Sequence, residues 1–253
     1  MVELSYPELA LLALAGGAAG WLNVLAGGGS LLTVPIMLFM GLPGPVANGT
    51  NRIAIIAQNI VAVASFFRRG FSDFRLSLSL AACASVGAFF GANVGVAVEG
   101  AWFDRLVAAI IIGVMILMAT GGDKSSVNGS KTGEPKNLVL GHVLFIGAGF
   151  WGGFIQIAVG FVMMPILHRV MGLDLVRVNM HKVFVALCFS LVALAVFAAR
   201  VDIAWDAGVA LAVGNAVGGW LGANAAVDKG APFIRKVLYV ALAGMALKLI
   251  FFP

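Results

Sequence analysis

Eight long apolar stretches make up nearly all of this 253-residue chain and limit what it can fold into. They lie at about residues 5–40, 46–67, 76–98, 101–121, 137–171, 178–199, 207–227 and 233–252. Most of them reach the roughly 20 residues that a helix needs to cross a bilayer. Hydrophobic residues form 61% of the chain and charged residues 11%, which leaves too little polar sequence to cover a soluble surface. The sequence therefore predicts an all-α polytopic membrane protein.

The net charge of +5 bears on the partners of the chain. Basic residues lie mainly at the ends of the apolar stretches, which is typical of cytoplasmic loops and not of a nucleic-acid-binding face. We therefore expect the lipid bilayer as a partner, no nucleic acid, and a multi-pass location in the cell inner (cytoplasmic) membrane. Cys83 and Cys188 have no Cys or His neighbours at metal-ligand spacing, so no metal or cofactor is expected.

The two halves of the chain are related by an internal repeat. From residue 41 onward a shift of 131 positions superposes them, and before that point a shift of 130 aligns Pro35 with Pro165. Pairs aligned by the larger shift include Asn48 and Asn179, Arg69 and Arg200, Gly87 and Gly218, and Gly91 and Gly222. We predict a first membrane repeat at 1–121, a polar cytoplasmic linker at 122–136 and a second repeat at 137–253.

The loop charges predict how these repeats are oriented. The loop with Arg68, Arg69 and Arg75 is basic, whereas the matching loop of the second half carries Asp202 and Asp206. Opposite bias in matched loops predicts antiparallel halves, because lysine and arginine collect in cytoplasmic loops. Inversion requires an odd number of crossings in each half. We therefore predict an inverted repeat of about 5+5 transmembrane segments, in which the first hairpin of each half is interrupted or re-entrant.

A glycine cluster interrupts the first of these hairpins. Gly27, Gly28 and Gly29 precede Ser30, where a new helix is expected to begin. The N-terminus of such a helix attracts anions through its unpaired N–H groups and its dipole. The same glycines also permit a tight turn and close helix packing, and the sequence favours neither alternative over the other.

Two basic residues lie inside apolar stretches. Arg52 and Lys182 occupy nearly matching places in the two halves, and an ionisable group at bilayer depth costs roughly 2.5–3.5 kcal/mol on insertion scales. They either line an anion site or reach the membrane interface through their long stems. His181, beside Lys182, is either a proton carrier or a structural histidine bonded to a helix carbonyl.

Interrupted helices at matching places in inverted repeats are typical of the binding sites of transporters. We therefore expect an oxyanion to be held where the two interrupted helices meet, with alternating access by rocking of one repeat against the other. Polar side chains such as Gln58 and Asn59 add donors and acceptors nearby. The predicted substrate-binding residues are Asn23, Gly27, Gly28, Gly29, Ser30, Asn48, Thr50, Asn51, Arg52, Gln156, Asn179, His181 and Lys182.

Several motifs resemble the TauE/SafE (sulfite exporter / toluene-sulfonate uptake permease) family of membrane transporters. They are Asn23, Ala26 to Ser30, Thr33-Val34-Pro35, Gly41-Leu42-Pro43 and Gly49-Thr50-Asn51 in the first half, and Gly149, Gly152, Gly153, Pro165 and Gly172-Leu173 in the second. The resemblance covers essentially the whole chain. It implies a secondary transporter for a sulfur-containing anion, such as sulfite, a sulfonate or a related organosulfur oxyanion, driven by a proton or ion gradient.

The second half departs from the family pattern. Gln156 to Gly160 replaces a second glycine cluster, and Met180-His181-Lys182 replaces the usual Gly-Thr-Ser or Gly-Thr-Asn. Alternative functions are a passive anion channel and a membrane scaffold or intramembrane enzyme. The chain has no HExxH, GxSxG or Walker pattern, so we do not expect an enzyme. Small-residue spacings such as Gly87 and Gly91 fit packing either within one subunit or in a homo-oligomer.

Overall fold

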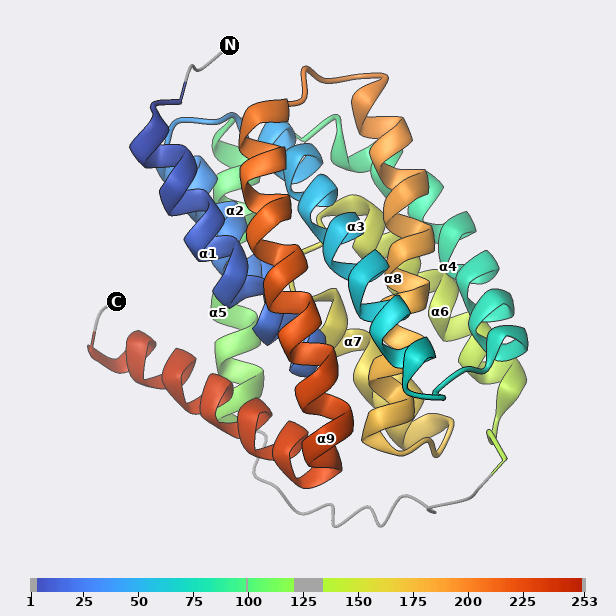
Figure 1. The fold of residues 1–253 in the computed structure, drawn as a ribbon. Coiled ribbons are helices and arrows are strands. Elements are labelled where there is room, and N and C mark those ends of the chain that lie inside the picture. The colour runs from blue at the N-terminus through green and yellow to red at the C-terminus, as the bar shows by residue number, and fades with distance from the viewer. Residues whose placement is uncertain (1–3, 99, 121–133, 252–253) are drawn as a thin grey trace.

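The computed structural model describes residues 4–98, 100–120 and 134–251, and every regular element in these ranges is a helix (Figure 1). The first half contains α1 (Tyr6–Leu25), α2 (Ser30–Phe39), α3 (Gly44–Arg68), α4 (Phe74–Gly95) and α5 (Ala101–Thr120). The second contains α6 (Leu138–Phe154), α7 (Val159–Pro165), the π-helix η1 (Ile166–Val170), α8 (Leu175–Ala198) and α9 (Trp205–Phe251). The predicted all-α class is confirmed.

Helix length and surface character fit a bilayer. Within the described ranges α1, α3, α4 and α8 are long and apolar enough to cross a membrane. Large apolar side chains are exposed on the outer surface, among them Phe39, Phe90, Trp102, Val139 and Trp220. Polar and charged side chains such as Asn48, Arg52 and Lys182 are instead buried inside. Lipid requires an apolar exterior, and polar groups at membrane depth must find their partners inside the protein.

Helices α3 and α8 lie side by side at the centre and are flanked by two closely packed pairs, α1 with α9 and α4 with α6 (Figure 1). Glycines bring these pairs together. A Cβ atom on Gly218 would lie 2.0 Å from the carbonyl oxygen of Gly17, and one on Gly87 would lie 2.0 Å from that of Ile146. Because no larger residue fits at such a distance, these are small-residue interfaces of the kind that membrane helices use.

Each predicted interruption is a break between two helices that fold back on themselves. Gly27, with φ 85°, lies in the first break, and Gln156 and Ala158, with φ 62° and 60°, lie in the second. The second hairpin returns to its starting side, because the backbone N–H of Lys136 donates to the carbonyl oxygen of Met171 at 3.0 Å. The first does likewise, since Leu4 and Leu42 from its two ends line one groove.

The last helix has two parts. Gly230 interrupts α9 with non-helical dihedral angles, φ 65° and ψ −167°. The α3–α4 connection (69–73) and the α8–α9 connection (199–204) lie at opposite ends of the molecule (Figure 1). We refer to these as the α3–α4 end and the α8–α9 end. Most of the predicted linker at 122–136 lies outside the described residues, and the division into repeats at 1–121 and 137–253 stays a prediction.

Candidate functional site

Arg52 lies on the carbonyl end of α6. Its side chain is fully buried. One terminal nitrogen donates to the carbonyl oxygen of Gly152 at 3.0 Å and to Oε1 of Gln156 at 3.1 Å, and the other donates to the carbonyl oxygen of Gly153 at 2.5 Å. The last carbonyl groups of a helix have no partner within the helix and carry a partial negative charge. The guanidinium group therefore caps α6.

Asn48 and Phe197 support this cap. Oδ1 of Asn48, one turn before Arg52 on α3, accepts from the guanidinium group at 3.3 Å. Its Nδ2 donates to the carbonyl oxygen of Phe154 at 2.8 Å. The ring of Phe197 lies 4.6 Å from the guanidinium carbon, within the range of a cation–π contact. The charge is thus held by three elements, α3, α6 and α8.

Lys182 caps the other broken helix. Its Nζ donates to the carbonyl oxygens of Val24 at 2.7 Å and Asn23 at 3.1 Å, at the end of α1, and to Oδ1 of Asn179 at 2.8 Å. An ammonium group has three protons, and these three acceptors use all of them. Lys182, like Arg52, is buried and does not reach toward the surface. A direct bond from either residue to a substrate stays a prediction.

The two breaks touch at the centre of the molecule. A Cβ atom on Gly27 would lie 2.5 Å from the Cα atom of Gly160, so the two backbones meet there. A small cavity of about 10 Å³ lies beside this contact, close to the volume that one water molecule needs. Its lining comprises Asn23, Gln58, Asn59, Gln156, Val159, Gly160, Met163, Lys182, Val183 and Ala186. We refer to it as the central cavity.

A chain of amides lines the central cavity. Nδ2 of Asn23 donates to Oε1 of Gln58 at 3.2 Å, and Nε2 of Gln58 donates to Oδ1 of Asn59 at 3.3 Å. Nδ2 of Asn59 is buried and has no hydrogen-bond partner. Gln58 and Asn59 stand outside the predicted site set, although two adjacent amides in an apolar stretch are a signal that sequence reasoning can use. The amide chain ends on a free donor.

The other predicted residues of the first half hold the hairpin in place. Nδ2 of Asn51 donates to Oγ of Ser30 at 3.1 Å, and Oγ1 of Thr33 donates to Oδ1 of Asn51 at 2.7 Å, which fixes α3 to the first turn of α2. Thr50 lies away from the central cavity, where its Oγ1 accepts from the backbone N–H of Ala204 at 3.1 Å.

Gly28 and Gly29 are packed against protein. Their Cβ positions would lie 2.8 Å from the ring of Phe161 and 2.3 Å from the carbonyl oxygen of Ala19, respectively. Close packing is therefore present at the glycine cluster. Anion binding by its backbone N–H groups stays a prediction.

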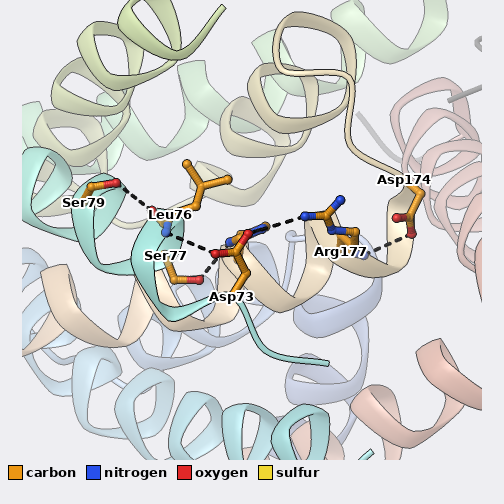
Figure 2. Close-up of polar contacts among 7 residues, drawn as sticks. Asp73, Leu76, Ser77, Ser79, Asp174 and Arg177 are labelled. Atoms are coloured by element: carbon orange, nitrogen blue, oxygen red, sulfur yellow. Dashed lines mark hydrogen bonds and ion pairs between the residues drawn. The ribbon is translucent and has the colours of Figure 1, made fainter. Parts of the chain in front are cut away.

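His181 lies with a second polar cluster, at the α3–α4 end. Its Nδ1 is 2.8 Å from Oγ of Ser77, and its Nε2 is 4.0 Å from Oδ2 of Asp73. Asp73 accepts from the backbone N–H of Leu76 at 3.3 Å, at the start of α4, and from Arg177 at 3.4 Å. Figure 2 shows Asp73 between the first turn of α4 and Arg177 on α8. His181 does not line the central cavity.

The ionisable side chains buried in the interior are basic, and one of them, Lys182, lines the central cavity. Arg52, His181 and Lys182 are the buried ionisable side chains in the described part of the chain, and none of them is a carboxylate. Among the same residues, no three His, Cys, Asp or Glu side chains gather as a metal site would require.

Taken together, a lipid-facing exterior, two broken helices that meet at the centre and a buried positive interior define a multi-pass helical membrane protein with a polar central site. A sequence model described as Sulfite exporter TauE/SafE matches residues 12–249. The chain belongs to the sulfite exporter TauE/SafE family, which confirms the resemblance seen in the motifs.

Relatives of the chain are named as transporters. A probable membrane transporter protein ORF9 from Sinorhizobium sp. is 26% identical over 100% of this chain and 96% of its own. A probable membrane transporter protein from Haemophilus influenzae is 25% identical over 99% of this chain and 97% of its own. The probable membrane transporter protein YfcA from Escherichia coli K12 is 25% identical over 92% of this chain and 86% of its own. No solved structure matches the chain.

Proposed function

We propose that this protein is a secondary transporter that moves a sulfur-containing anion, sulfite or a sulfonate, across the cytoplasmic membrane by alternating access. The central cavity is the observation that carries the proposal. It is lined by Lys182, by Asn59 with its free donor, and by Gln156, which accepts a bond from Arg52. Donors without acceptors, in a positive interior, fit an oxyanion.

The electrostatic balance supports an anion. Arg52 and Lys182 contribute two full positive charges, and each lies on a helix end that carries about half a negative charge. About one positive charge therefore remains uncompensated in the interior. Nε of Arg52 and Nδ2 of Asn59 are buried donors without partners, ready to bind an acceptor. The sulfur chemistry rests on the name of the family alone.

An inverted repeat accounts for the element order. Adding 131 to the bounds of α3, 44 and 68, gives 175 and 199, and α8 spans 175–198. The same addition takes α4, 74–95, to 205–226, within α9. Two bonds are also reciprocal: Arg69 donates to Asn224 at 3.3 Å, and Arg200 donates to Asn93 at 3.4 Å. These correspondences support two halves of 5+5 segments with opposite orientation.

The hollows of the structure support alternating access. The central cavity is too small for a sulfite ion, so the surrounding helices must separate to admit one. A groove of about 720 Å³ lies at the α8–α9 end and is lined by Pro43, Val46 and Ala204. The α3–α4 end has a pocket of about 20 Å³ and a groove of about 440 Å³ lined by Arg68 and Arg69. None of these three hollows shares a lining residue with the central cavity, so we infer a state in which the centre is closed from both ends.

Flux into liposomes tests the proposal. Purified protein is reconstituted, and uptake of radiolabelled sulfite is measured with and without unlabelled sulfite inside, and with and without a pH gradient. A transporter gives saturable uptake that internal sulfite accelerates by exchange. A large electrical current without saturation indicates a channel instead. If the folded protein moves neither sulfite nor methanesulfonate, the proposal is wrong.

A further inference from the structure

The imidazole of His181 has one side bonded and one side without a partner. Its Nδ1 is engaged by Ser77, and the buried Nε2 makes no hydrogen bond. The atom that faces this nitrogen is Oδ2 of Asp73, at 4.0 Å. A neutral imidazole can take a proton on one ring nitrogen, and a carboxylate at this distance would stabilise the imidazolium that forms.

The charged groups around His181 come from two helices. Asp73 precedes α4, and Asp174 and Arg177 belong to the start of α8, where Asp174 accepts from the backbone N–H of Val176 at 2.9 Å. Helix α3 presents only apolar side chains to the pocket at this end, namely Val63, Phe66 and Phe67. Asp73 is therefore the carboxylate placed to receive a bond from Nε2.

Asp73 also connects His181 to water. Its side chain is 31% exposed, whereas His181 is fully buried. The adjoining pocket of about 20 Å³ is walled mainly by phenylalanine rings, which leaves little room for solvent beside the imidazole. A proton can therefore reach Nε2 by way of the carboxylate. Such a route joins the aqueous phase to one buried basic nitrogen.

The opposite end of the molecule has no such pair. The position that aligns with His181 is Thr50, because 50 plus 131 is 181, and Asp73 aligns with Ala204 in the same way. Thr50 accepts from the backbone N–H of Ala204 at 3.1 Å, so this contact is a neutral hydrogen bond. A titratable pair thus lies at the α3–α4 end, and a neutral hydrogen bond lies at the matching place at the α8–α9 end.

We propose that His181 binds the coupling proton of transport, with Asp73 as its counter-ion; this rests on the transporter function proposed above. A proton from water adds to Nε2, the imidazole becomes an imidazolium, and Asp73 remains a carboxylate that accepts the new N–H bond. This bond draws the start of α4 toward α8 and holds the α3–α4 end closed. Loss of the proton to water removes this bond and leaves the bonds of Asp73 with Arg177 and of Ser77 with His181 between the two helices, which weakens the closure and favours opening at that end.

The proton site and the central cavity share one helix. Lys182 follows His181 directly on α8, and consecutive helical residues point about 100° apart. His181 faces α4, while Lys182 faces the end of α1 and lines the central cavity. A movement of α8 that closes the first contact therefore shifts the second. This is the physical link between proton binding and anion binding.

Substrate-driven proton movement tests the proposal. Wild-type protein and the His181→Gln variant are reconstituted with a pH-sensitive dye inside the liposomes, and a gradient of methanesulfonate is applied. Methanesulfonate keeps one negative charge across the pH range used, so its own protonation does not contribute. We expect the wild-type protein to move protons with the anion. In the variant, the rate of proton movement should be lower by about tenfold or more. Exchange of labelled for unlabelled methanesulfonate, which needs no net proton movement, is expected to persist in the variant.

His142→Gln serves as the matched control, because His142 bonds to Ser79 and to the carbonyl oxygen of Leu138 and has no aspartate beside it. Asp73→Asn is a second test at a partly exposed position, and it should lose proton movement while keeping exchange. Wild-type exchange without proton movement, or proton movement that persists in His181→Gln, overturns this inference and leaves the transporter function standing. Loss of exchange in both His181→Gln and Asp73→Asn would assign the pair a structural role, and this result also overturns the inference. Absence of exchange in the wild type refutes the transporter function itself.

Discussion

The ammonium group of Lys182 lies on the carbonyl end of α1 in the same way that the guanidinium group of Arg52 lies on the carbonyl end of α6. Each cation comes from a central helix of one half and caps the broken helix of the other. Asn179 and Asn48, which align under the repeat, support them with their side-chain oxygens. The two buried charges therefore tie the halves of the chain to each other.

Arg52→Ala should destabilise the protein strongly. The carbonyl groups of Gly152 and Gly153 and the amide of Gln156 would lose their donor in a buried place, which costs about 1–3 kcal/mol for each unsatisfied group. Arg52→Lys should recover only part of this, because an ammonium group lacks the planar fork that reaches both terminal carbonyls. Thermal unfolding in detergent measures the effect, and an unchanged unfolding temperature in Arg52→Ala would contradict the cap.

Lys182→Met should impair both stability and anion binding. Methionine has a similar length but leaves the carbonyl group of Val24 and Oδ1 of Asn179 without a donor, at about 1–3 kcal/mol for each unsatisfied group. It also removes the charge that lines the central cavity. Lys136→Met, at an exposed position, is the control. Unfolding temperature and sulfite exchange should both fall in the first variant and stay near wild type in the second.

Asn59 offers a test of the cavity that spares the caps. Asn59→Asp replaces the free donor with a carboxylate of nearly equal size, which repels an anion. The carboxylate can still accept the hydrogen bond that Gln58 donates to residue 59. A hydrogen bond to a charged group contributes about 1.5–3 kcal/mol, so we expect KM for sulfite to rise by about tenfold or more. Asn137→Asp, at the exposed start of α6, is the matched control. Equal KM values for the two variants would remove Asn59 from the site.

The contact between the two breaks is tested by a pair of glycines with the same backbone angle. Gly27 and Gly41 both have φ 85°, but a Cβ atom on Gly27 meets Gly160, whereas one on Gly41 meets nothing within 4 Å. Both alanine variants carry the strain of a positive φ, and only Gly27→Ala adds overpacking of about 1–3 kcal/mol. The difference between their unfolding free energies measures the contact. No difference would mean that the breaks do not touch.

Cysteine labelling tests the inverted orientation. In a cysteine-free background, Ser72→Cys at the α3–α4 end should react with a membrane-impermeant reagent only from the cytoplasmic side, beside the basic loop of Arg68 and Arg69. Asp202→Cys, at the α8–α9 end, should react only from the other side. Labelling of both positions from one side would exclude the orientation proposed for the two halves.

Local sequence signals predicted much of the helical architecture and only part of the site. The apolar stretches indicated the helices, and the run from Gly27 to Gly29 indicated the first break, because glycine tolerates a positive φ. The second break has no such run, and its left-handed residues are Gln156 and Ala158, which only the repeat pointed to.

The partners of the buried charges were beyond sequence reasoning. Arg52 bonds to residues about a hundred positions away, and such a pairing depends on how the halves pack. His181 was grouped with Lys182 because they are adjacent in sequence. A helix turns neighbouring side chains about 100° apart, so the two residues face different parts of the molecule.

The meeting of Gly27 and Gly160 has a mechanical consequence. The contact joins two backbones without side chains at Gly27 and Gly160, and the ring of Phe161 packs against Gly28 beside it, so the backbone contact itself is small in area. It can serve as a pivot about which the two hairpins tilt, while the capped helix ends beside it move as levers. A pivot of this kind keeps its position through the cycle, and the path of the anion would then change direction around one fixed point.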